Sequence, residues 1–330
     1  MSASPPLARA YLAISPCRNE AVHMRRTLDS VVAQTLRPAR WIIVDDGSTD
    51  DSAAILAEYA ARHDWITVIA RRDRGHRAVG PGVVEAFYDG LAQVDLDRYA
   101  YVCKLDLDLD LPAGYFAELI RRMEAEPRLG TCSGKPYVRT RTGALVSERC
   151  GDEMSVGMTK LYRTACFRDI GGLVRSVMWD GIDCHKARQL GWIAASWDEP
   201  GLRFEHLRPM GTSDRGVMSG RMRHGAGQYF MGSDPLYFLA TAVYRMSRPP
   251  YVLGGLAMIW GYLRAALLRA PRHADAELRQ FVRAYQRRAL WVGKRKATAE
   301  IDAANRHRRP APAAPDRSPR IGEQSGIARR

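Results

Sequence analysis

Residues 99–111 read YAYVCKLDLDLDL, an apolar run that changes into alternating leucine and aspartate. The run 99–105 predicts a short buried strand. In the extended chain that follows, Asp106 and Asp108 point to one side, while the leucines point to the other and are buried. Like charges on one face repel unless a cation neutralises them, and Mg²⁺ or Mn²⁺ takes carboxylates together with phosphate oxygens and water. The pattern favours a metal site for a diphosphate ligand over a solvated acidic edge strand.

Other apolar runs extend this reading along the chain. Short buried strands are predicted at 11–15, 41–44 and 67–70, and helical periodicity follows the first two. Alternating strands and helices predict an α/β fold with a mostly parallel sheet flanked by helices. Ligands bind such sheets at the carboxyl ends of the strands. Three acidic clusters fall at predicted strand ends or in loops: residues 45–50, 106–110 and 179–183.

Length and charge exclude several classes of protein. With 330 residues, 46% of them apolar, the chain can bury a large core, so it is not collagen-like, disordered or a disulfide miniprotein. Residues 1–214 carry 28 Lys and Arg against 29 Asp and Glu, whereas residues 215–330 carry 22 against 7. Since the net charge of +14 belongs to the C-terminal third, a nucleic-acid-binding function of the whole chain loses support.

The cysteines and the N-terminus indicate a cytoplasmic protein. The six cysteines form no CxxC pair that would suggest a zinc site, and residues 1–10 contain no apolar segment typical of a secretion signal. Reduced thiols in a cytosolic compartment are therefore expected.

Several short motifs occur together in one order. They are SPCRNE at 15–20, VDDGSTDDS at 44–52, KLDLD at 104–108, YR at 162–163 with GG at 171–172, and WDGID at 179–183 with GW at 191–192. With them the chain resembles the family 2 glycosyltransferases of the GT-A fold over roughly residues 10–210. The resemblance implies a Rossmann-like catalytic domain in residues 1–214.

The resemblance also implies roles for individual residues. It puts the nucleotide of a sugar donor, with UDP favoured, near residues of the first two loops: Pro16, Arg18, Glu20, Asp45 and Asp46. Asp108 is the implied direct ligand of Mg²⁺ or Mn²⁺. Asp106 is placed on the ribose or on a metal-bound water. His206 resembles the histidine that completes the metal or diphosphate site in some of these enzymes, although a lone histidine is more often structural.

Transfer with inversion needs a carboxylate base opposite the leaving diphosphate. The Glu-Asp pair that usually supplies it is replaced by WDGID, so Asp180 and Asp183 both remain candidates. Asp183 is slightly favoured because it begins the predicted helix 184–190, of which Asp180 could be the N-cap.

Residues 215–300 predict a helical extension with apolar stretches bracketed by arginine. The longest charge-free run, 249–263, has 15 residues, about 22 Å as a helix, too short to span a bilayer. A buried helical hairpin and helices lying on a membrane surface both remain, and the flanking arginines favour the membrane. Arg221 and Arg223 could bind the donor diphosphate or an acceptor phosphate, or form a basic loop facing the membrane. Residues 301–330 are predicted to be a disordered basic tail.

The resemblance and the extension lead to one expected function. It is the inverting, metal-dependent transfer of a single sugar from a nucleotide diphosphate sugar to a saccharide acceptor, for which a polyprenyl-linked one is favoured. It would take place at the cytoplasmic face of the membrane, in polysaccharide or glycolipid biosynthesis. A single transfer is favoured because the Gln-x-x-Arg-Trp motif of processive relatives is absent from the sequence. The alternatives are a sugar nucleotidyltransferase and a non-enzymatic basic protein that binds nucleic acid.

Overall fold

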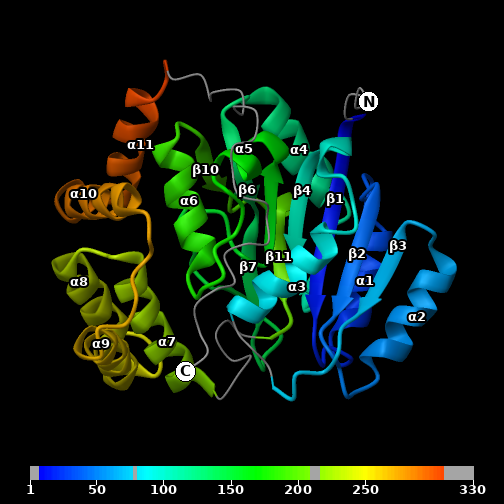
Figure 1. Ribbon diagram of the computed structural model, residues 1–330, viewed down its shortest axis with the longest axis horizontal. Coiled ribbons are helices and arrows are strands. Elements are labelled where there is room, and N and C mark those ends of the chain that lie inside the picture. The colour runs from blue at the N-terminus through cyan, green and yellow to red at the C-terminus, as the bar shows by residue number, and fades with distance from the viewer. Residues whose placement is uncertain (1–6, 77–79, 209–215, 308–330) are drawn as a thin grey trace.

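The computed structural model describes residues 7–76, 80–208 and 216–307. Its centre is a seven-stranded sheet in the order β10-β6-β9-β4-β1-β2-β3 (Figure 1). The strands are β1 (Leu7–Cys17), β2 (Arg40–Asp45), β3 (Ile66–Ala70), β4 (Tyr99–Leu105), β6 (Leu129–Ser133), β9 (Thr159–Arg163) and β10 (Ile193–Ser196). The four strands predicted from the sequence are confirmed. The sheet is mixed, because β9 runs antiparallel to β4 and β6 while the other neighbours are parallel.

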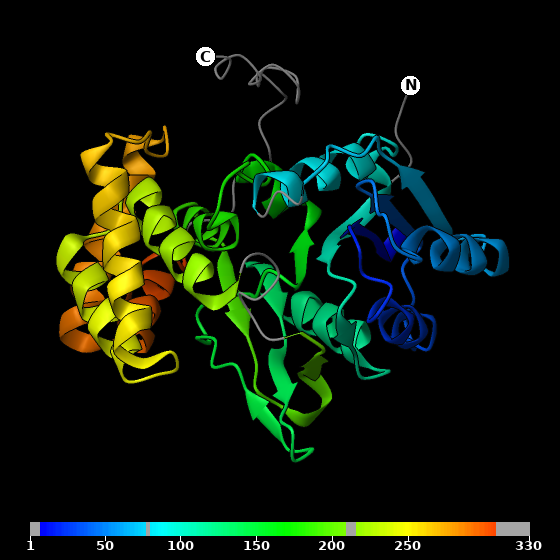
Figure 2. The same cartoon turned by 90° about the horizontal axis from the view of Figure 1, so that it is seen from below.

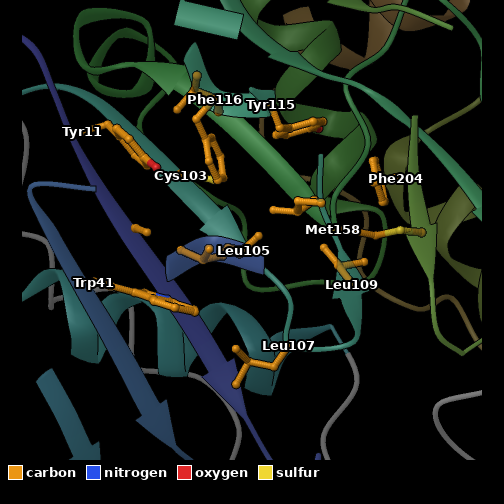
Figure 3. Packing of buried hydrophobic residues seen from close by; sticks show 14 of the residues in the cluster. Tyr11, Trp41, Cys103, Leu105, Leu107, Leu109, Tyr115, Phe116, Met158 and Phe204 are labelled. Carbon is orange, nitrogen blue, oxygen red and sulfur yellow. The ribbon is translucent and has the colours of Figure 1, made fainter. Parts of the chain in front are cut away.

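Helices cover both faces of this sheet because apolar side chains alternate along its central strands. Tyr11 packs with α1 (Met24–Val32), α2 (Ser52–Arg62) and α4 (Tyr115–Ala125). Leu12 packs on the other face with α3 (Pro81–Leu91), α5 (Thr164–Asp169) and α6 (Trp179–Gln189). Figure 3 shows Tyr11, Trp41 and Leu105 in the first of these layers. Two 3₁₀ turns occur at Leu96–Arg98 and Pro200–Leu202.

A second, four-stranded sheet positions the acidic stretch that follows β4. Its order is β5-β11-β7-β8, with β5 at Leu109–Asp110, β7 at Lys135–Arg139, β8 at Leu145–Ser147 and β11 at Arg203–His206. In the antiparallel pair of β11 and β5, His206 lies opposite Leu109. The Leu207 amide also donates to the Asp108 carbonyl at 2.8 Å. This pairing brings residues about a hundred positions apart into contact.

The C-terminal helices gather beside α6, at the end of the molecule away from β3 (Figures 1 and 2). They are α7 (Gly216–Met231), α8 (Pro235–Met246), α9 (Tyr251–Leu267), α10 (Ala276–Val292) and α11 (Lys294–Ala304). Leu278 and Val282 of α10 pack against Ile182 of α6 and Met231 of α7 in one buried cluster. The extension is therefore packed on the α/β domain. The predicted boundary between residues 214 and 215 falls within the segment 209–215, which lies outside the described residues.

Two predictions about helix ends are corrected. The predicted helix 184–190 begins earlier, at Trp179, with Met178 as the N-cap, so Asp180 lies in the first turn and does not cap the helix. Order also continues beyond residue 301, the predicted start of the disordered tail. Asp302 lies 3.2 Å from the Arg188 guanidinium, and the Asn305 side chain donates to the Arg188 carbonyl at 3.0 Å. The remainder of the predicted tail, residues 308–330, lies outside the described residues.

Close backbone contact joins α9 to α7. A Cβ atom at Gly225 would lie 1.9 Å from the Met258 carbonyl oxygen, and one at Gly261 would lie 2.1 Å from that of Met222. Only glycine permits this approach of the two helices. Within the described residues, no helix is both long and apolar enough to cross a membrane.

Replacing Gly261 by alanine should therefore weaken the C-terminal helical bundle. The added methyl group clashes with backbone, which cannot rotate away, so we expect the free energy of unfolding to fall by about 1–3 kcal/mol. Urea denaturation followed by circular dichroism measures the change. Gly201→Ala is the matched control, because a Cβ built there has no heavy atom within 4 Å apart from those of its own residue and its two chain neighbours. Equal stability of the two variants would contradict the close packing of α7 and α9.

Candidate active site

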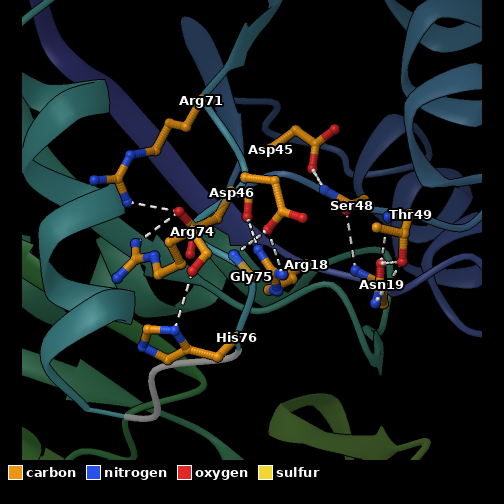
Figure 4. Close-up of polar contacts among 11 residues, drawn as sticks. Arg18, Asn19, Asp45, Asp46, Ser48, Thr49, Arg71, Arg74, Gly75 and His76 are labelled. Atoms are coloured by element: carbon orange, nitrogen blue, oxygen red, sulfur yellow. Dashed lines mark hydrogen bonds and ion pairs between the residues drawn. The ribbon is translucent and has the colours of Figure 1, made fainter.

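The loops that follow β1 and β2 are bonded to each other (Figure 4). The backbone N–H of Asn19 donates to Ser48 Oγ at 3.0 Å, and the backbone N–H of Thr49 donates to Asn19 Oδ1 at 2.8 Å. Asn19 adopts a left-handed backbone with φ of 53°, which asparagine tolerates better than most residues. The two motifs identified in the sequence thus form one surface at the carboxyl edge of the sheet.

The two aspartates of the second loop have different surroundings. Asp45 Oδ1 accepts a bond from the Ser48 amide at 2.9 Å, so Asp45 shapes the turn. Asp46 Oδ1 accepts bonds from Arg71 and Arg74, both at 2.7 Å. These two arginines were not identified from the sequence. They follow β3, and their position at the same sheet edge as Asp46 could have indicated a role in the site.

Arg18 and Pro16 complete this corner of the site. The Arg18 guanidinium donates to the Asp46 carbonyl oxygen and, at 2.6 Å, to Asp73 Oδ1. Pro16 lies half-buried at the end of β1, opposite Val44 of β2. Arginine donors and a buried carboxylate at one strand edge can bond both the carbonyl and the N–H groups of a nucleobase.

Asp106 and Asp108 do not share one environment. Asp106 is about one-third exposed and forms an ion pair with Lys104. The Asp108 side chain is only 6% exposed, and its Oδ2 accepts a bond from Arg208 Nη2 at 2.7 Å. Asp108 Oδ1 is buried without a hydrogen-bond partner, which is costly for a carboxylate oxygen.

His206 lies beside Asp108, as the sequence suggested. Its Nε2 is 3.6 Å from Asp108 Oδ2, and its Nδ1 is 2.7 Å from Glu148 Oε2. Burial would lower the pKa of His206, but Asp108 and Glu148 outweigh burial and raise it to about 9. Burial would raise the pKa of Asp108, but His206 and Arg208 outweigh burial and lower it to about 2. Glu148, which orients the ring through Nδ1, was missed in the sequence.

Arg208 connects this carboxylate to the first loop. Its Nη2 also donates to Glu20 Oε1 at 2.9 Å. Glu20 is therefore part of the Asp108 network, and the donor loop and the acidic stretch form one site. Arg208 was also missed, although it stands two residues after His206.

Asp108 and His206 are suitable ligands for a divalent cation. Each could give one atom, and the buried unpartnered Oδ1 of Asp108 would gain a partner. Across the described ranges, no cluster of three or more His, Cys, Asp and Glu side chains could hold a metal. Two protein ligands fit Mg²⁺ or Mn²⁺ if phosphate and water supply the others.

Asp180 and Asp183, the two candidate bases, are clearly distinguished by burial. Asp183 is 2% exposed, its Oδ1 lies 2.6 Å from Lys160 Nζ, and its Oδ2 accepts a bond from the Tyr162 hydroxyl. Burial alone would lower the pKa of Lys160, but the facing Asp183 carboxylate raises it. Asp180 is only partly buried. Both oxygens of Asp183 are thus used inside the protein, which favours Asp180 over Asp183, and the identity of the base stays a prediction.

A tryptophan lies between the two carboxylate networks. Lys104 of β4 and Lys160 of β9 stand opposite each other, and their ammonium groups lie 5.3 Å and 5.5 Å from the centre of the Trp179 ring. Both distances are within the range of cation–π attraction. Trp179 therefore fixes the start of α6, and with it the position of Asp180.

Arg221 and Arg223 lie on α7. Arg221 is partly buried, and burial together with the nearby Arg245 lowers its pKa. Arg223 donates to Ser219 Oγ at 3.3 Å. These contacts place Arg221 within the helical extension, and the binding of phosphate by either arginine stays a prediction.

Comparison with known proteins agrees with the motifs. Residues 13–174, about half of the chain, match the family model described as glycosyl transferase family 2. Poly-beta-1,6-N-acetyl-D-glucosamine synthase of Staphylococcus aureus (strain COL) is 30% identical over 132 residues, which are 39% of this chain and 29% of that protein. The chain thus matches less than a third of the length of that relative.

Two solved structures show similarity over most of the chain. GalNAc-T7, solved with UDP, GalNAc and Mn²⁺, gives a TM-score of 0.55 at 13% identity, over 90% of this chain and 57% of that chain. The mannosyltransferase PcManGT from Pyrobaculum calidifontis, solved with GDP-Man and Mn²⁺, gives 0.48 at 18% identity, over 92% and 88%. The match to GalNAc-T7 supports the α/β fold of the GT-A type.

The protonated His206 should make the stability of the metal-free protein depend on pH. Because its folded pKa of about 9 lies above the reference value of 6.5, its contribution is complete below pH 6.5 and disappears as the pH rises through 9. Relative to His206→Gln, the wild type should lose up to about 3 kcal/mol of unfolding free energy between about pH 6 and pH 10. Urea denaturation in the presence of a metal chelator measures this difference between the two proteins. A difference that does not change with pH would contradict the raised pKa of His206.

Proposed function

We propose that this chain, whose residues 13–174 belong to glycosyl transferase family 2, is an enzyme that transfers a sugar from a nucleotide diphosphate sugar to a saccharide acceptor. The observation that carries the proposal is the buried Asp108 carboxylate. It lies beside His206, has one unpartnered oxygen, and is joined through Arg208 to the loop containing Glu20. This arrangement suits a ligand that brings both a diphosphate and a cation.

The donor nucleotide would bind at the edge formed by β1, β2 and β3. Asp46 with Arg18, Arg71 and Arg74 can bond the polar edge of a base, and we favour uracil, whose imide N–H suits a carboxylate. Asp106, which is one-third exposed, is suited to the ribose. UDP is also the nucleotide in the structure of GalNAc-T7, the fold relative with the TM-score of 0.55.

Asp108 and His206 would hold Mg²⁺ or Mn²⁺. When bound, the cation would supply positive charge to the diphosphate as it leaves. His206 must give up its proton to become a ligand, and Glu148 keeps the ring oriented through Nδ1 while it does so. The Arg208 guanidinium adds a second positive charge beside the same carboxylate.

Asp180 is the base that we propose for an inverting reaction. Its carboxylate would take the proton from the acceptor hydroxyl, whose oxygen forms the new bond to the sugar as the bond to the diphosphate oxygen breaks. Its partial exposure supports this role. Asp183 would instead hold Lys160 and Tyr162 in place in the protein interior.

The acceptor that we favour is a saccharide on a polyprenyl lipid, which would receive one sugar at the cytoplasmic face of a membrane. The similarity to the Staphylococcus aureus synthase, whose name refers to a polysaccharide, supports a role in polysaccharide or glycolipid biosynthesis. The basic charge of residues 215–330 supports a position at an anionic surface. Arg221 and Arg223 could then contact the lipid phosphate.

Product analysis separates this function from that of a sugar nucleotidyltransferase. With UDP-sugars, Mn²⁺ and a saccharide acceptor, we expect free UDP and no inorganic diphosphate. Asp108→Asn, which removes a charged ligand, should lower the rate by at least about tenfold and weaken the stabilisation of the protein by UDP with Mn²⁺ in thermal shift. Release of inorganic diphosphate from UTP and a sugar 1-phosphate, in a parallel assay, would indicate the nucleotidyltransferase. Stabilisation by RNA and by no nucleotide sugar would instead indicate a nucleic-acid-binding protein.

Replacement of each candidate base tests the mechanism. Asp180→Asn should lower kcat by about 10²–10⁴ at saturating donor and leave the folded protein as stable as the wild type. Asp183→Asn should lower the unfolding free energy by about 3–5 kcal/mol, because it leaves Lys160 buried without its counter-charge. Steady-state kinetics and urea denaturation of both variants measure these effects. A loss of kcat below tenfold in Asp180→Asn would exclude Asp180 as the base.

A further inference from the structure

The outward side of α8 is apolar. Leu236, Leu239 and Val243 recur at helical spacing and are between 49 and 70% exposed. The inner side of the same helix buries Phe238 and Ala242 against Met258 of α9. A helix that faced only water on its outer side would carry polar residues there.

The neighbouring helix α9 has its small residues inside and its large residues outside. Gly261 and Ala265 are buried, and Gly261 touches the backbone of α7. Leu256, Trp260 and Leu263 follow one another along the outer side and are about half exposed. Together with the outward side of α8, they are here called the α8–α9 face. Six large apolar side chains exposed on two neighbouring helices are more than scattered exposed residues would explain.

The charges within α8, α9 and the segments that follow them have one sign. Residues 235–270 contain four arginines and no acidic residue. Arg245 and Arg248 stand where α8 ends, and Arg264 and Arg269 where α9 ends. The aliphatic part of arginine can lie along apolar surface while its guanidinium reaches a phosphate group.

We propose that the α8–α9 face docks on a lipid bilayer that contains anionic lipids, with its leucines and Trp260 among the acyl chains and its arginines at the headgroups. The bilayer supplies the negative charges that the face lacks. A second copy of this chain would bring arginine against arginine. This inference rests on the proposed function, which includes a lipid-linked acceptor, and it deepens that function.

The docked face would be rigidly connected to the proposed base. α9 is held on α7 by the contacts of Gly225 and Gly261, and a Cβ atom at Gly227 of α7 would lie 2.5 Å from Met178 Cγ. Met178 is the N-cap of α6, two residues before Asp180. Docking would therefore fix the distance from the membrane surface to the site that accepts the sugar.

Co-sedimentation with vesicles tests the docking surface. The full chain should bind vesicles of phosphatidylcholine with phosphatidylglycerol at least about tenfold more tightly than vesicles of phosphatidylcholine alone. The triple variant Leu256→Ser, Trp260→Ser, Leu263→Ser should lose at least about tenfold of this affinity. Its folding should not suffer, because all three side chains are exposed, and circular dichroism verifies this. Trp291→Ser is the matched control, since Trp291 is 87% exposed but lies on α10, and it should bind as the wild type does.

Three results would overturn the inference: no binding of the wild type to anionic vesicles, equal binding of the triple variant, or a wild-type dimer that the triple variant converts to monomer. The last would make a second copy the occupant. Hydrolysis of a soluble UDP-sugar with Mn²⁺, measured on the same proteins, distinguishes this failure from failure of the proposed function. Hydrolysis without vesicle binding would refute only the docking surface, whereas vesicle binding without hydrolysis or transfer would support docking and refute the enzyme.

Discussion

A carboxylate removed from water has to be neutralised, and the neutralisation of Asp108 connects the parts of the site. Arg208 contacts Asp108 Oδ2, and His206 lies farther from the same oxygen. Glu148 in turn holds the His206 imidazole through Nδ1. Arg208 also reaches Glu20, so the loop after β1, the acidic stretch after β4 and the end of β11 become one unit. The pairing of β11 with β5 in the small second sheet brings these charges together.

The sequence predicted those features that depend on local pattern. Strands β1 to β4 and the alternation around Asp106 and Asp108 follow from runs of neighbouring residues. The partners Glu148, Arg71 and Arg74 could not be found in the same way, because each contact joins segments that only the fold brings together. Strand β9 was not predicted at all, and periodicity could not have shown that it runs antiparallel to β4.

Burial distinguishes Asp180 from Asp183 in a way that the sequence could not. The two residues lie three positions apart on α6, so their sequence context is nearly the same, but one side chain points into the interior toward Lys160. In the extension the sequence left open a buried helical hairpin and helices lying on a membrane surface. The glycines and alanines of α9 face the protein while its leucines and Trp260 face outward, and contact with a membrane stays a prediction.

The contact of α11 with Arg188 has a consequence for how such a chain can change over evolution. Arg188 and Asp180 stand on the same helix, and Asp302 and Asn305, far along the chain, hold Arg188 from outside. The C-terminal helices could therefore not be exchanged between catalytic domains without a loss of stability. A recombination event that replaced them would leave the fully buried Arg188 guanidinium without its acid and would loosen the helix that carries the proposed base, so the two parts should be inherited together.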